Sequence, residues 1–443
     1  MKTSNRSIYA LAGVIVAACA AVAPAGAHAE AWSLDSCITY AVAHNISVRQ
    51  QALQIDDSEL TVTQAKDAFL PTLSADASES FNFGRGLTAD NTYADRNTTN
   101  FQWGVSLNLP LFQGLENVRR LKYAKAALQQ TLLEYEAAKD DIELNVITQY
   151  LQVLYAREVV KSSQAQVDLS EYQLERQRAL AAAGKVAEAE VYDLEAQLAQ
   201  NRLQLVSAQG DARTQLITLA NLLQLGDAEG FDIQGLDGDN AYLPAASQVL
   251  EQALATNNSI LAARAAITAA KDNVAVAKSG WIPKLSFGAS TGSQYYSVSG
   301  FDNESFGNQM RHNYSTYFGF RLSIPIFDAF STRNSVRRAR LQQIQATLEA
   351  ERRETEIDKT IRLAHTQAVA SRDQYKASQE SLEATGKAFE AVREKFDLGR
   401  ATSYELQQAS NNLFRTEISA IQARYDYLLR CRILQFYQTG GIS

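Results

Sequence analysis

The sequence is poor in proline, methionine, histidine and cysteine. Its 443 residues include only 6 prolines, 2 methionines, 4 histidines and 3 cysteines. Scarce proline favours long helices, because a proline inside a helix costs about 3 kcal/mol. His44, His312 and His365 are scattered along the chain, and the sequence has no metal-ligand spacing, phosphate loop or nucleophile motif. We therefore expect a protein that is not an enzyme and that has no cofactor and no metal site.

Basic blocks and long hydrophobic runs are also missing from the sequence. The formal net charge is −7, and no cluster of lysine and arginine stands out, so nucleic acid is not an expected partner. After the N-terminal segment, no stretch approaches the ~18 apolar residues of a membrane-spanning helix. If the chain resides in a membrane, strands that close into a barrel must cross it.

Residues 1–29 are typical of a signal peptide. Two basic residues precede an apolar run over Ile8–Val22, and Ala27–Ala29 provides a cleavage site with small flanking residues. One alternative is an uncleaved membrane anchor. The other is a lipoprotein acylated at Cys19, which follows a loose lipobox.

Removal of this segment would leave two cysteines, Cys37 and Cys431, near opposite ends of the chain. We expect two independent buried thiols. A single disulfide between them is the alternative, because an exported protein meets oxidising conditions.

The chain is a tandem duplication with a period of about 212 to 215 residues. The matched segments are Phe69–Ser74 with Trp281–Ser286, Leu109–Phe112 with Ile324–Phe327, Ala43–Asn45 with Ala255–Asn257, and Gly184 with Gly399. Since they follow the same order at nearly one offset, we expect two copies of one structural unit. Repeat 1 would cover residues 30–240, and repeat 2 would cover residues 241–443.

Each repeat contains two segments in which apolar and polar residues alternate. We expect strands at about 72–83 and 99–110, and at about 284–297 and 313–325, separated by polar loops. Strands of this length cross a bilayer when tilted. The residues that we expect to face lipid are Phe101, Trp103, Val105, Leu107, Phe318, Phe320 and Leu322. The alternative is a half-buried sheet in a water-soluble protein.

The helical segments are unusually long. We expect long helices at 115–183 and 329–398, each followed by a tight turn and a shorter return helix at 188–224 or 402–436. About 69 residues of helix would extend roughly 100 Å. Considered alone, such helices would also suit a solvated coiled coil.

The ordered motifs of the chain resemble those of the TolC family of outer-membrane efflux factors. They are Trp32–Ala41, the pair Phe69–Leu73 and Trp281–Leu285, the two Leu/Ile-Pro-Leu/Ile-Phe strand ends, and the glycine-containing helical turns. The segment Phe81–Arg85 resembles the Bacteroidetes branch of that family. The resemblance covers essentially the whole chain after the signal peptide.

The resemblance implies a mainly α fold with a membrane β-barrel contribution. Three chains with four strands each would close a twelve-stranded barrel in outer-membrane lipid, and the long antiparallel helices would form a periplasmic α-barrel. The homotrimer would work with a periplasmic adaptor protein and an inner-membrane pump to export small molecules such as drugs. Alternatives are type I protein secretion, metal efflux, or a periplasmic coiled-coil structural protein. The sequence does not name the transported substrate.

The resemblance also assigns roles to the ends of the helices. The turns that would contact the adaptor contain Gly184, Lys185 and Val186 in the first repeat, and Gly399, Arg400 and Ala401 in the second. The candidates for a periplasmic gate are Glu405, Gln408, Arg400 and Phe396. Since only one of the two expected acidic positions is acidic, the trimer would carry a single carboxylate ring. An ordinary exposed helix charge is the alternative role of Glu405.

Overall fold

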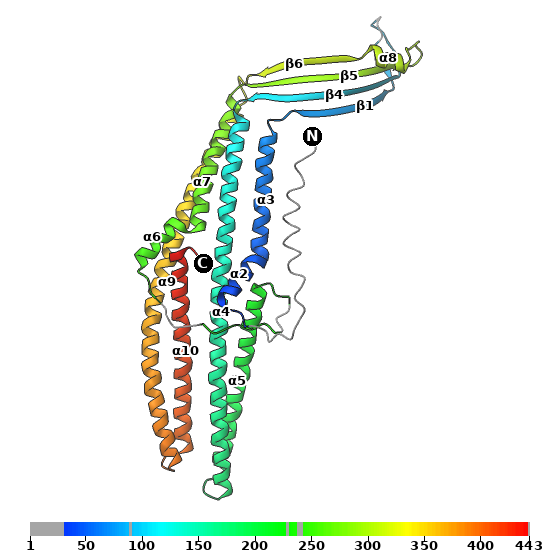
Figure 1. The fold of residues 1–443 in the computed structure, drawn as a ribbon. Helices are drawn as coiled ribbons and strands as arrows, with labels where there is room; N and C mark the ends of the chain where they lie inside the picture. Colours follow the sequence, from blue (N-terminus) through cyan, green and yellow to red (C-terminus); the bar gives the residue numbers. More distant parts are fainter. Residues whose placement is uncertain (1–30, 88–90, 227–229, 237–241, 442–443) are drawn as a thin grey trace, which may run out of the picture. The chain divides into compact units, whose positions relative to one another are not determined.

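The computed structural model describes residues 31–87, 91–226, 230–236 and 242–441 (Figure 1). The expected signal peptide, residues 1–29, and Cys19 lie outside this range, so their processing stays a prediction. The chain is mainly helical and contains one four-stranded sheet. Within the described ranges, no helix combines the length and the hydropathy that a membrane span requires.

The chain packs into two compact units. Unit 1 takes its described residues from Met1–His44, Asn145–Ala241 and Ser371–Leu429, and unit 2 from Asn45–Leu144, Tyr242–Ala370 and Arg430–Ser443. Each unit thus combines segments from both halves of the sequence. The units of packing therefore differ from the two sequence repeats.

Two long helices dominate the chain. The helices α4 (Glu116–Ala182) and α9 (Ser331–Asp397) have 67 residues each, so each extends roughly 100 Å. The sequence predicts both helices with ends one or two residues farther out. The return helices are α5 (Glu188–Leu222) and α10 (Ser403–Thr439).

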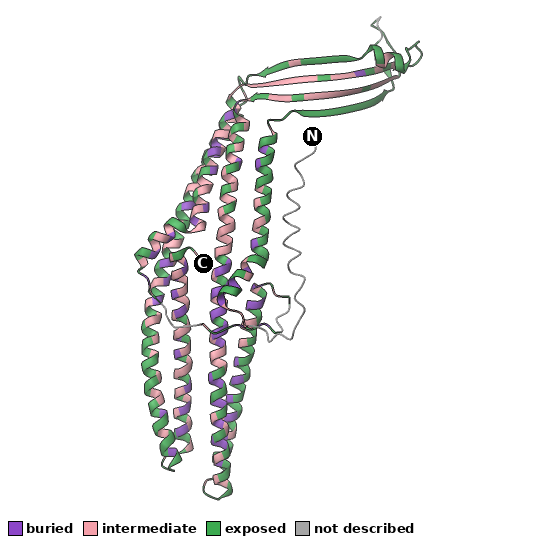
Figure 2. Cartoon of the chain, viewed as in Figure 1, coloured by how far each residue is buried: buried purple, intermediate pink, exposed green. Residues whose placement is uncertain are grey.

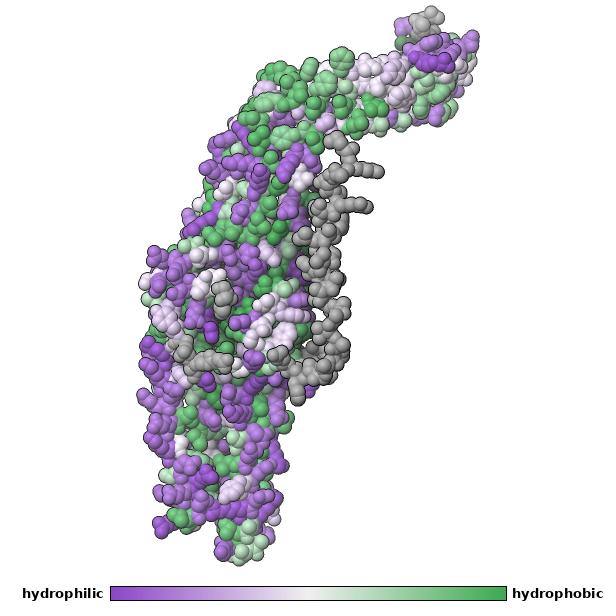
Figure 3. Space-filling view, viewed as in Figure 1, coloured by the Kyte–Doolittle hydropathy of each residue, from purple (hydrophilic) through white to green (hydrophobic). Residues whose placement is uncertain are grey.

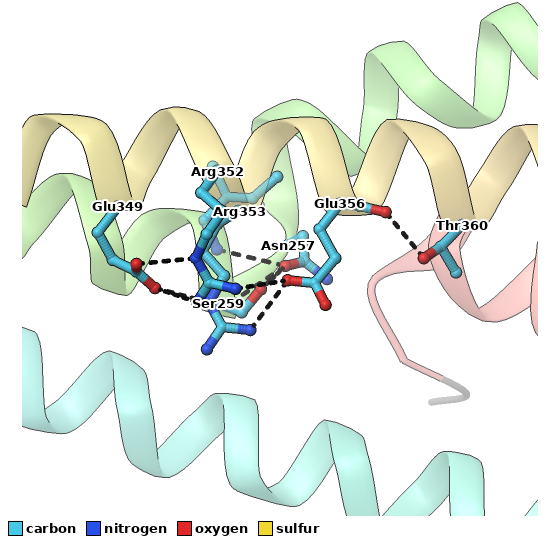
Figure 4. Close-up of polar contacts among 8 residues, drawn as sticks. Asn257, Ser259, Glu349, Arg352, Arg353, Glu356 and Thr360 are labelled. Atoms are coloured by element: carbon cyan, nitrogen blue, oxygen red, sulfur yellow. Dashed lines mark hydrogen bonds and ion pairs between the residues drawn. The ribbon is translucent and has the colours of Figure 1, made fainter.

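Two asparagines start the helices that precede the strands. Asn45 separates α2 (Leu34–His44) from α3 (Ile46–Asp67), and its Oδ1 accepts a hydrogen bond of 2.9 Å from the Ser47 amide. Asn257 likewise separates α6 (Ala246–Thr256) from α7 (Asn258–Ala277), and it accepts from the Ser259 amide at 3.1 Å (Figure 4). An N-cap that satisfies a free amide in this way is worth about 1 kcal/mol. This capping explains why the two asparagines are matched landmarks of the duplication.

The exposed side of α9 in unit 2 carries a short ladder of ion pairs (Figure 4). The Arg352 guanidinium contacts the Glu349 carboxylate at 2.9 Å, and Arg353 lies 3.5 Å from Glu356. These pairs are three residues apart and largely exposed, so each stabilises the helix by only a few tenths of a kcal/mol. The ladder is a structural feature of a solvated helix face.

The sheet belongs entirely to unit 2 and is antiparallel throughout. Its strands lie in the order β1 (Thr72–Asn82), β4 (Thr98–Gln113), β5 (Lys284–Val298) and β6 (Ser315–Ser323). The strands of both repeats therefore pair into one sheet, with β1 and β6 at its edges.

The structure differs from the sequence analysis at Pro110 and in the loops. Pro110 was expected to end its strand, but β4 continues to Gln113, because a bulge between Pro110 and Phe112 accommodates the missing amide. The first expected loop contains the short strands β2 (Arg85–Leu87) and β3 (Tyr93–Asp95). The second contains the helix α8 (Phe306–His312).

Each unit has its own apolar core (Figure 2). In unit 1, Val167 and Leu174 of α4 pack against Leu194, Leu198 and Leu205 of α5. In unit 2, the core joins three helices, and its fully buried members are Val249 of α6, Ile361 and Ala368 of α9, and Leu434 of α10. Burying each leucine or isoleucine contributes about 1.5–3 kcal/mol.

A buried tyrosine holds the start of the described chain in unit 1. The Tyr150 hydroxyl lies 3.1 Å from the carbonyl oxygen of Trp32 and 2.7 Å from that of Gln234. Arg157 donates a 2.7 Å hydrogen bond to the neighbouring Ile233 carbonyl. These contacts fix the short parallel bridge between Trp32 and Ile233.

Cys37 and Cys431 are both buried, and neither forms a disulfide bond within the described part of the chain. The alternative of a disulfide between them is therefore wrong, and the expectation of two separate thiols is confirmed. Cys37 has no exposed surface, and burial raises the pKa of its thiol to about 12. A thiol in this environment stays protonated and inert.

Candidate channel site: the two-faced sheet and the helical turns

The strand register divides the sheet into an apolar and a polar face. Residues that pair across antiparallel strands share a face, so successive rows across the sheet lie alternately on one face and on the other. One apolar row consists of Leu73, Leu107, Ala289 and Phe318, and the next contains Leu109, Phe287 and Phe320. The Phe287 and Phe320 rings lie 5.3 Å apart.

The register places all seven expected lipid-facing residues on the apolar face. Phe318 and Phe320 of β6 are 73% and 71% exposed, which is unusual for large apolar side chains. In Figure 3, hydrophobic residues gather over the part of the sheet next to the helices, and hydrophilic residues surround the end that carries α8. Contact with lipid remains a proposal for this face.

One of the seven residues, Phe101, is packed against a helix of the same chain. The Phe306 ring of α8 lies 5.6 Å from the Phe101 ring and 5.2 Å from the Tyr295 ring. The helix α8 therefore covers the apolar face near the loops and partly shields Phe101.

The opposite face of the sheet is lined by small and polar side chains. Ser74 and Ser106 hydrogen-bond through their hydroxyls at 2.7 Å, and they share a row with Ser290 and Tyr317. Of the two neighbouring rows on the same face, the one nearer the loops contains Asp76 and the one nearer the helices contains Asn108. Such a surface suits contact with water.

The two helical turns in unit 1 have the same backbone geometry. In the first turn, the Lys185 amide donates to the Leu180 carbonyl at 3.0 Å, and the Gly184 amide donates to the Ala181 carbonyl at 2.8 Å. The Arg400 and Gly399 amides repeat this pattern at 2.7 and 3.0 Å. Both glycines have a φ of +70°, which the Schellman ending of a helix requires. The glycines thus fix two matching, exposed turns.

The turns differ at the start of the return helix. Thr402 and Glu405 form a capping box: the Thr402 amide donates to the Glu405 carboxylate at 2.8 Å, and the Glu405 amide donates to the Thr402 hydroxyl at 3.2 Å. The hydrogen bond from the Thr402 amide lowers the pKa of Glu405. The matching residue of the first turn is Ala187, which has no side-chain cap.

Glu190, the first-turn counterpart of Glu405, connects helices instead. Its carboxylate accepts a 2.6 Å hydrogen bond from the buried Gln177 amide of α4 and a 3.3 Å hydrogen bond from the Ser403 hydroxyl of α10. Glu190 therefore links the first helical turn to α4 and to the start of α10.

Arg176 of α4 binds the end of α9. Its guanidinium pairs with the Asp397 carboxylate and donates to the carbonyls of Phe396 and Asp397, each at 3.3 Å. It also lies 4.6 Å from the centre of the Phe396 ring. Phe396 is buried against Phe389 and Leu406, so its observed contacts are packing contacts.

The remaining gate and adaptor candidates lie at the surface. Arg400, Glu405 and Gln408 are exposed, and Glu405 and Gln408 are one helical turn apart on α10. The turn residues Gly184, Lys185 and Gly399 are exposed as well, whereas Val186 and Ala401 are half-buried. The structure thus leaves these turns accessible, and their roles stay proposals.

The sequence alone did not point to Arg176, Glu190 or the capping box. The pattern Thr402-x-x-Glu405 before an apolar helix could have revealed the box. No local signal identifies Arg176, because its partner Asp397 is 221 residues away in the sequence.

Comparison with known proteins agrees with this architecture. The family model described as outer membrane efflux protein matches residues 38–224 and 249–436. The outer membrane protein TolC of Vibrio cholerae is 24% identical over 395 residues, which cover 88% of this chain and 86% of that protein. The outer membrane efflux protein BepC of Brucella suis is also 24% identical, and the alignment covers 90% of this chain and 83% of BepC.

A solved structure shares the fold. The CmeC outer membrane channel of Campylobacter jejuni superposes with a TM-score of 0.77 at 18% identity, over 92% of this chain and 85% of CmeC. The mainly α fold with a β contribution is thereby confirmed. The chain belongs to the outer membrane efflux protein family, which is the TolC family indicated by its motifs.

Proposed function

We propose that this chain forms, as a homotrimer, the outer-membrane exit duct of a tripartite efflux system for small molecules such as drugs. The chain is an outer-membrane efflux channel that extends into the periplasm. Family members are channels, which agrees with the expectation that the chain is not an enzyme. Its trimeric state, its partners and the class of its substrate are the parts that we propose.

The two-faced sheet is the observation that supports this proposal. Its apolar face is exposed, and its edge strands β1 and β6 each have only one partner strand in the sheet. Lipid does not tolerate unpaired strand edges, since each unsatisfied amide or carbonyl costs several kcal/mol. Three sheets of four strands would pair β6 of one copy with β1 of the next and close a barrel of 3 × 4 = 12 strands.

The helices would extend this barrel as a tunnel. At roughly 100 Å, α4 and α9 are long enough to reach far into the periplasm. The exposed turns at Gly184 and Gly399 would bind the periplasmic adaptor, and the inner-membrane pump would supply the energy. Glu405 of the three copies would carry the carboxylate ring of the periplasmic entrance.

Membrane fractionation and electrophoresis test the assembly. We expect the full-length protein in the detergent-extracted outer membrane, as a trimer that resists dissociation in SDS until it is heated. In planar bilayers the purified trimer should form ion-conducting pores. A monomer found only in the soluble periplasmic fraction would support the coiled-coil alternative and overturn the proposal.

A further inference from the structure

We infer that Asp76 determines the ion preference of the β-stranded part of the duct, where it favours cationic over anionic solutes. The inference rests on the proposed function, since it requires the polar face of the sheet to line a water-filled pore. Asp76 lies on β1, four residues after its first residue Thr72, and its side chain belongs to the polar face.

Asp76 is the only carboxylate on the polar face of the four strands. The other charged residues of that face are Lys284 and Arg321. The Lys284 ammonium lies 2.7 Å from the Glu116 carboxylate, so its charge is largely compensated. Two uncompensated charges of opposite sign therefore remain, one acidic on β1 and one basic on β6.

The row that contains Asp76 leaves its carboxylate uncovered. Its partners across the sheet are Gly104, Gly292 and Ser315, none of which has a side chain longer than a hydroxymethyl group. A Cβ added to Gly292 would come within 2.4 Å of the Trp103 carbonyl oxygen, so a larger residue cannot stand there without a backbone shift. The small residues create a hollow along the row beside the carboxylate.

Polar groups surround this hollow. On the side of the loops it is lined by Gln102, Gln294 and Asn313. On the side of the helices it is lined by Ser290 and Tyr317, which belong to the neighbouring row. None of these residues carries a positive charge. The Asp76 carboxylate therefore faces solvent beside neutral hydrogen-bonding groups, and its charge is available to passing ions.

Within one copy, Arg321 is too distant to neutralise Asp76. Arg321 pairs with Ser286, whereas the Asp76 row crosses β5 at Gly292, six residues farther along the strand. Six residues of strand extend roughly 20 Å. This separation is more than twice the Debye length of about 8 Å at physiological ionic strength, so at that salt concentration the two charges of one copy act independently on solutes.

A ring of three carboxylates would influence most of the pore cross-section at low salt. Twelve strands spaced ~4.8 Å apart and tilted ~40° give a barrel radius of roughly 12 Å. The Debye length is about 30 Å at 0.01 M salt and about 3 Å at 1 M salt. In dilute salt the Asp76 and Arg321 rings both act on solutes in the pore, so the contribution of Asp76 is the change in ion preference that its substitution causes, and this change should vanish in concentrated salt.

Reversal potentials in planar bilayers test the role of Asp76. The full-length trimer is measured in a potassium chloride gradient near 0.01 M, first as wild type and then as Asp76→Asn. We expect the substitution to lower the potassium-to-chloride permeability ratio about twofold or more, and to have no effect near 1 M salt. Both proteins are also measured in a Glu405→Gln background, which removes the carboxylate proposed for the periplasmic entrance.

Glu79→Gln is the matched control. Glu79 lies three residues farther along β1 and pairs with Phe101 on the apolar face, so this change removes the same charge outside the proposed pore. We expect its permeability ratio to equal that of wild type. Arg321→Gln should shift the ratio in the opposite direction from Asp76→Asn.

The outcomes separate this inference from the proposed function. If trimers form pores but Asp76→Asn keeps the wild-type ratio in the Glu405→Gln background, the inference is wrong and the proposed function stands. If Glu79→Gln changes the ratio as much as Asp76→Asn does, the inference is equally wrong. If the purified trimer does not conduct at all, both the inference and the proposed function fail.

Discussion

Replacement of Arg176 by methionine should loosen the end of α9. The change keeps most of the aliphatic length of the side chain but removes every hydrogen bond of the guanidinium. The ion pair with Asp397 is partly exposed, with side-chain exposures of 25% and 49%, so we assign it ~0.5 kcal/mol. The contact with the Phe396 ring adds ~0.5 kcal/mol, and the two long hydrogen bonds to carbonyls together add ~1 kcal/mol.

The expected loss is therefore about 2 kcal/mol for local opening of the last turns of α9. Because each 1.4 kcal/mol corresponds to a factor of ten, hydrogen exchange of the amides in these turns should accelerate roughly 30-fold. Hydrogen-exchange mass spectrometry of the full-length trimer measures this rate. Exchange in the core of the α4–α5 hairpin should stay unchanged.

Arg178→Met is the matched control for this experiment. Arg178 lies two residues farther along α4, but its ion pair with Glu195 stays within the first hairpin. Its loss should therefore leave exchange at the end of α9 at the wild-type rate. If Arg176→Met changes that rate less than twofold, or if Arg178→Met accelerates it equally, the assigned role of Arg176 is incorrect.

Three further predictions concern the cap, a buried acid and the thiols. Thr402→Ala should accelerate exchange in the first turn of α10 about fivefold, while Ser403→Ala should not. Burial raises the pKa of Asp140 from 3.8 to about 6, so the folded chain binds the carboxyl proton more tightly than the unfolded chain does. The contribution of the protonated carboxyl to the free energy of unfolding is therefore complete below pH 4 and is lost as the pH rises through 6. Asp140→Asn should flatten this pH dependence of the free energy of unfolding by roughly 1–2 kcal/mol, which is less than the full shift implies because the carboxyl is partly exposed to solvent. An unchanged pH profile of the melting temperature would contradict this prediction. Cys37 should resist alkylation at pH 8 until the chain unfolds, and non-reducing gels should show no bridge between Cys37 and Cys431.

The sequence was sufficient to predict the regular elements of the fold. The long helices follow from the near absence of proline and from apolar residues at three- and four-residue spacing. The strands follow from strict alternation, as in Phe101, Trp103, Val105 and Leu107. The same alternation predicts the two faces of the sheet, because the apolar residues of neighbouring strands must lie on the same face to be buried or to contact lipid together.

The features that the sequence did not reveal depend on contacts between distant residues. The strand β4 passes Pro110 through a bulge that depends on its pairing with β5. The helix α8 was expected as a polar loop, although its Phe306 packs on Phe101 and Tyr295. Both features depend on partner residues in other elements, so no local sequence pattern predicts these contacts.

At the turns, local rules were sufficient for the backbone and insufficient for the side chains. Glycine at 184 and 399 predicts the Schellman endings, since only glycine adopts a left-handed backbone without strain. The partners of Glu190 and Arg176 lie on helices that are distant in the sequence, so only the fold brings them together.

Cysteine scanning along β4 tests the central claim that the sheet separates lipid from a water-filled pore. Single cysteines at 102 to 108 are introduced into the trimer in lipid bilayers and treated with a membrane-impermeant thiol reagent. Cysteines at Gln102, Ser106 and Asn108 should react rapidly, while those at Trp103, Val105 and Leu107 should react at least tenfold more slowly. Equal reactivity at all positions, or fast reaction at the odd-numbered ones, would contradict the proposed channel.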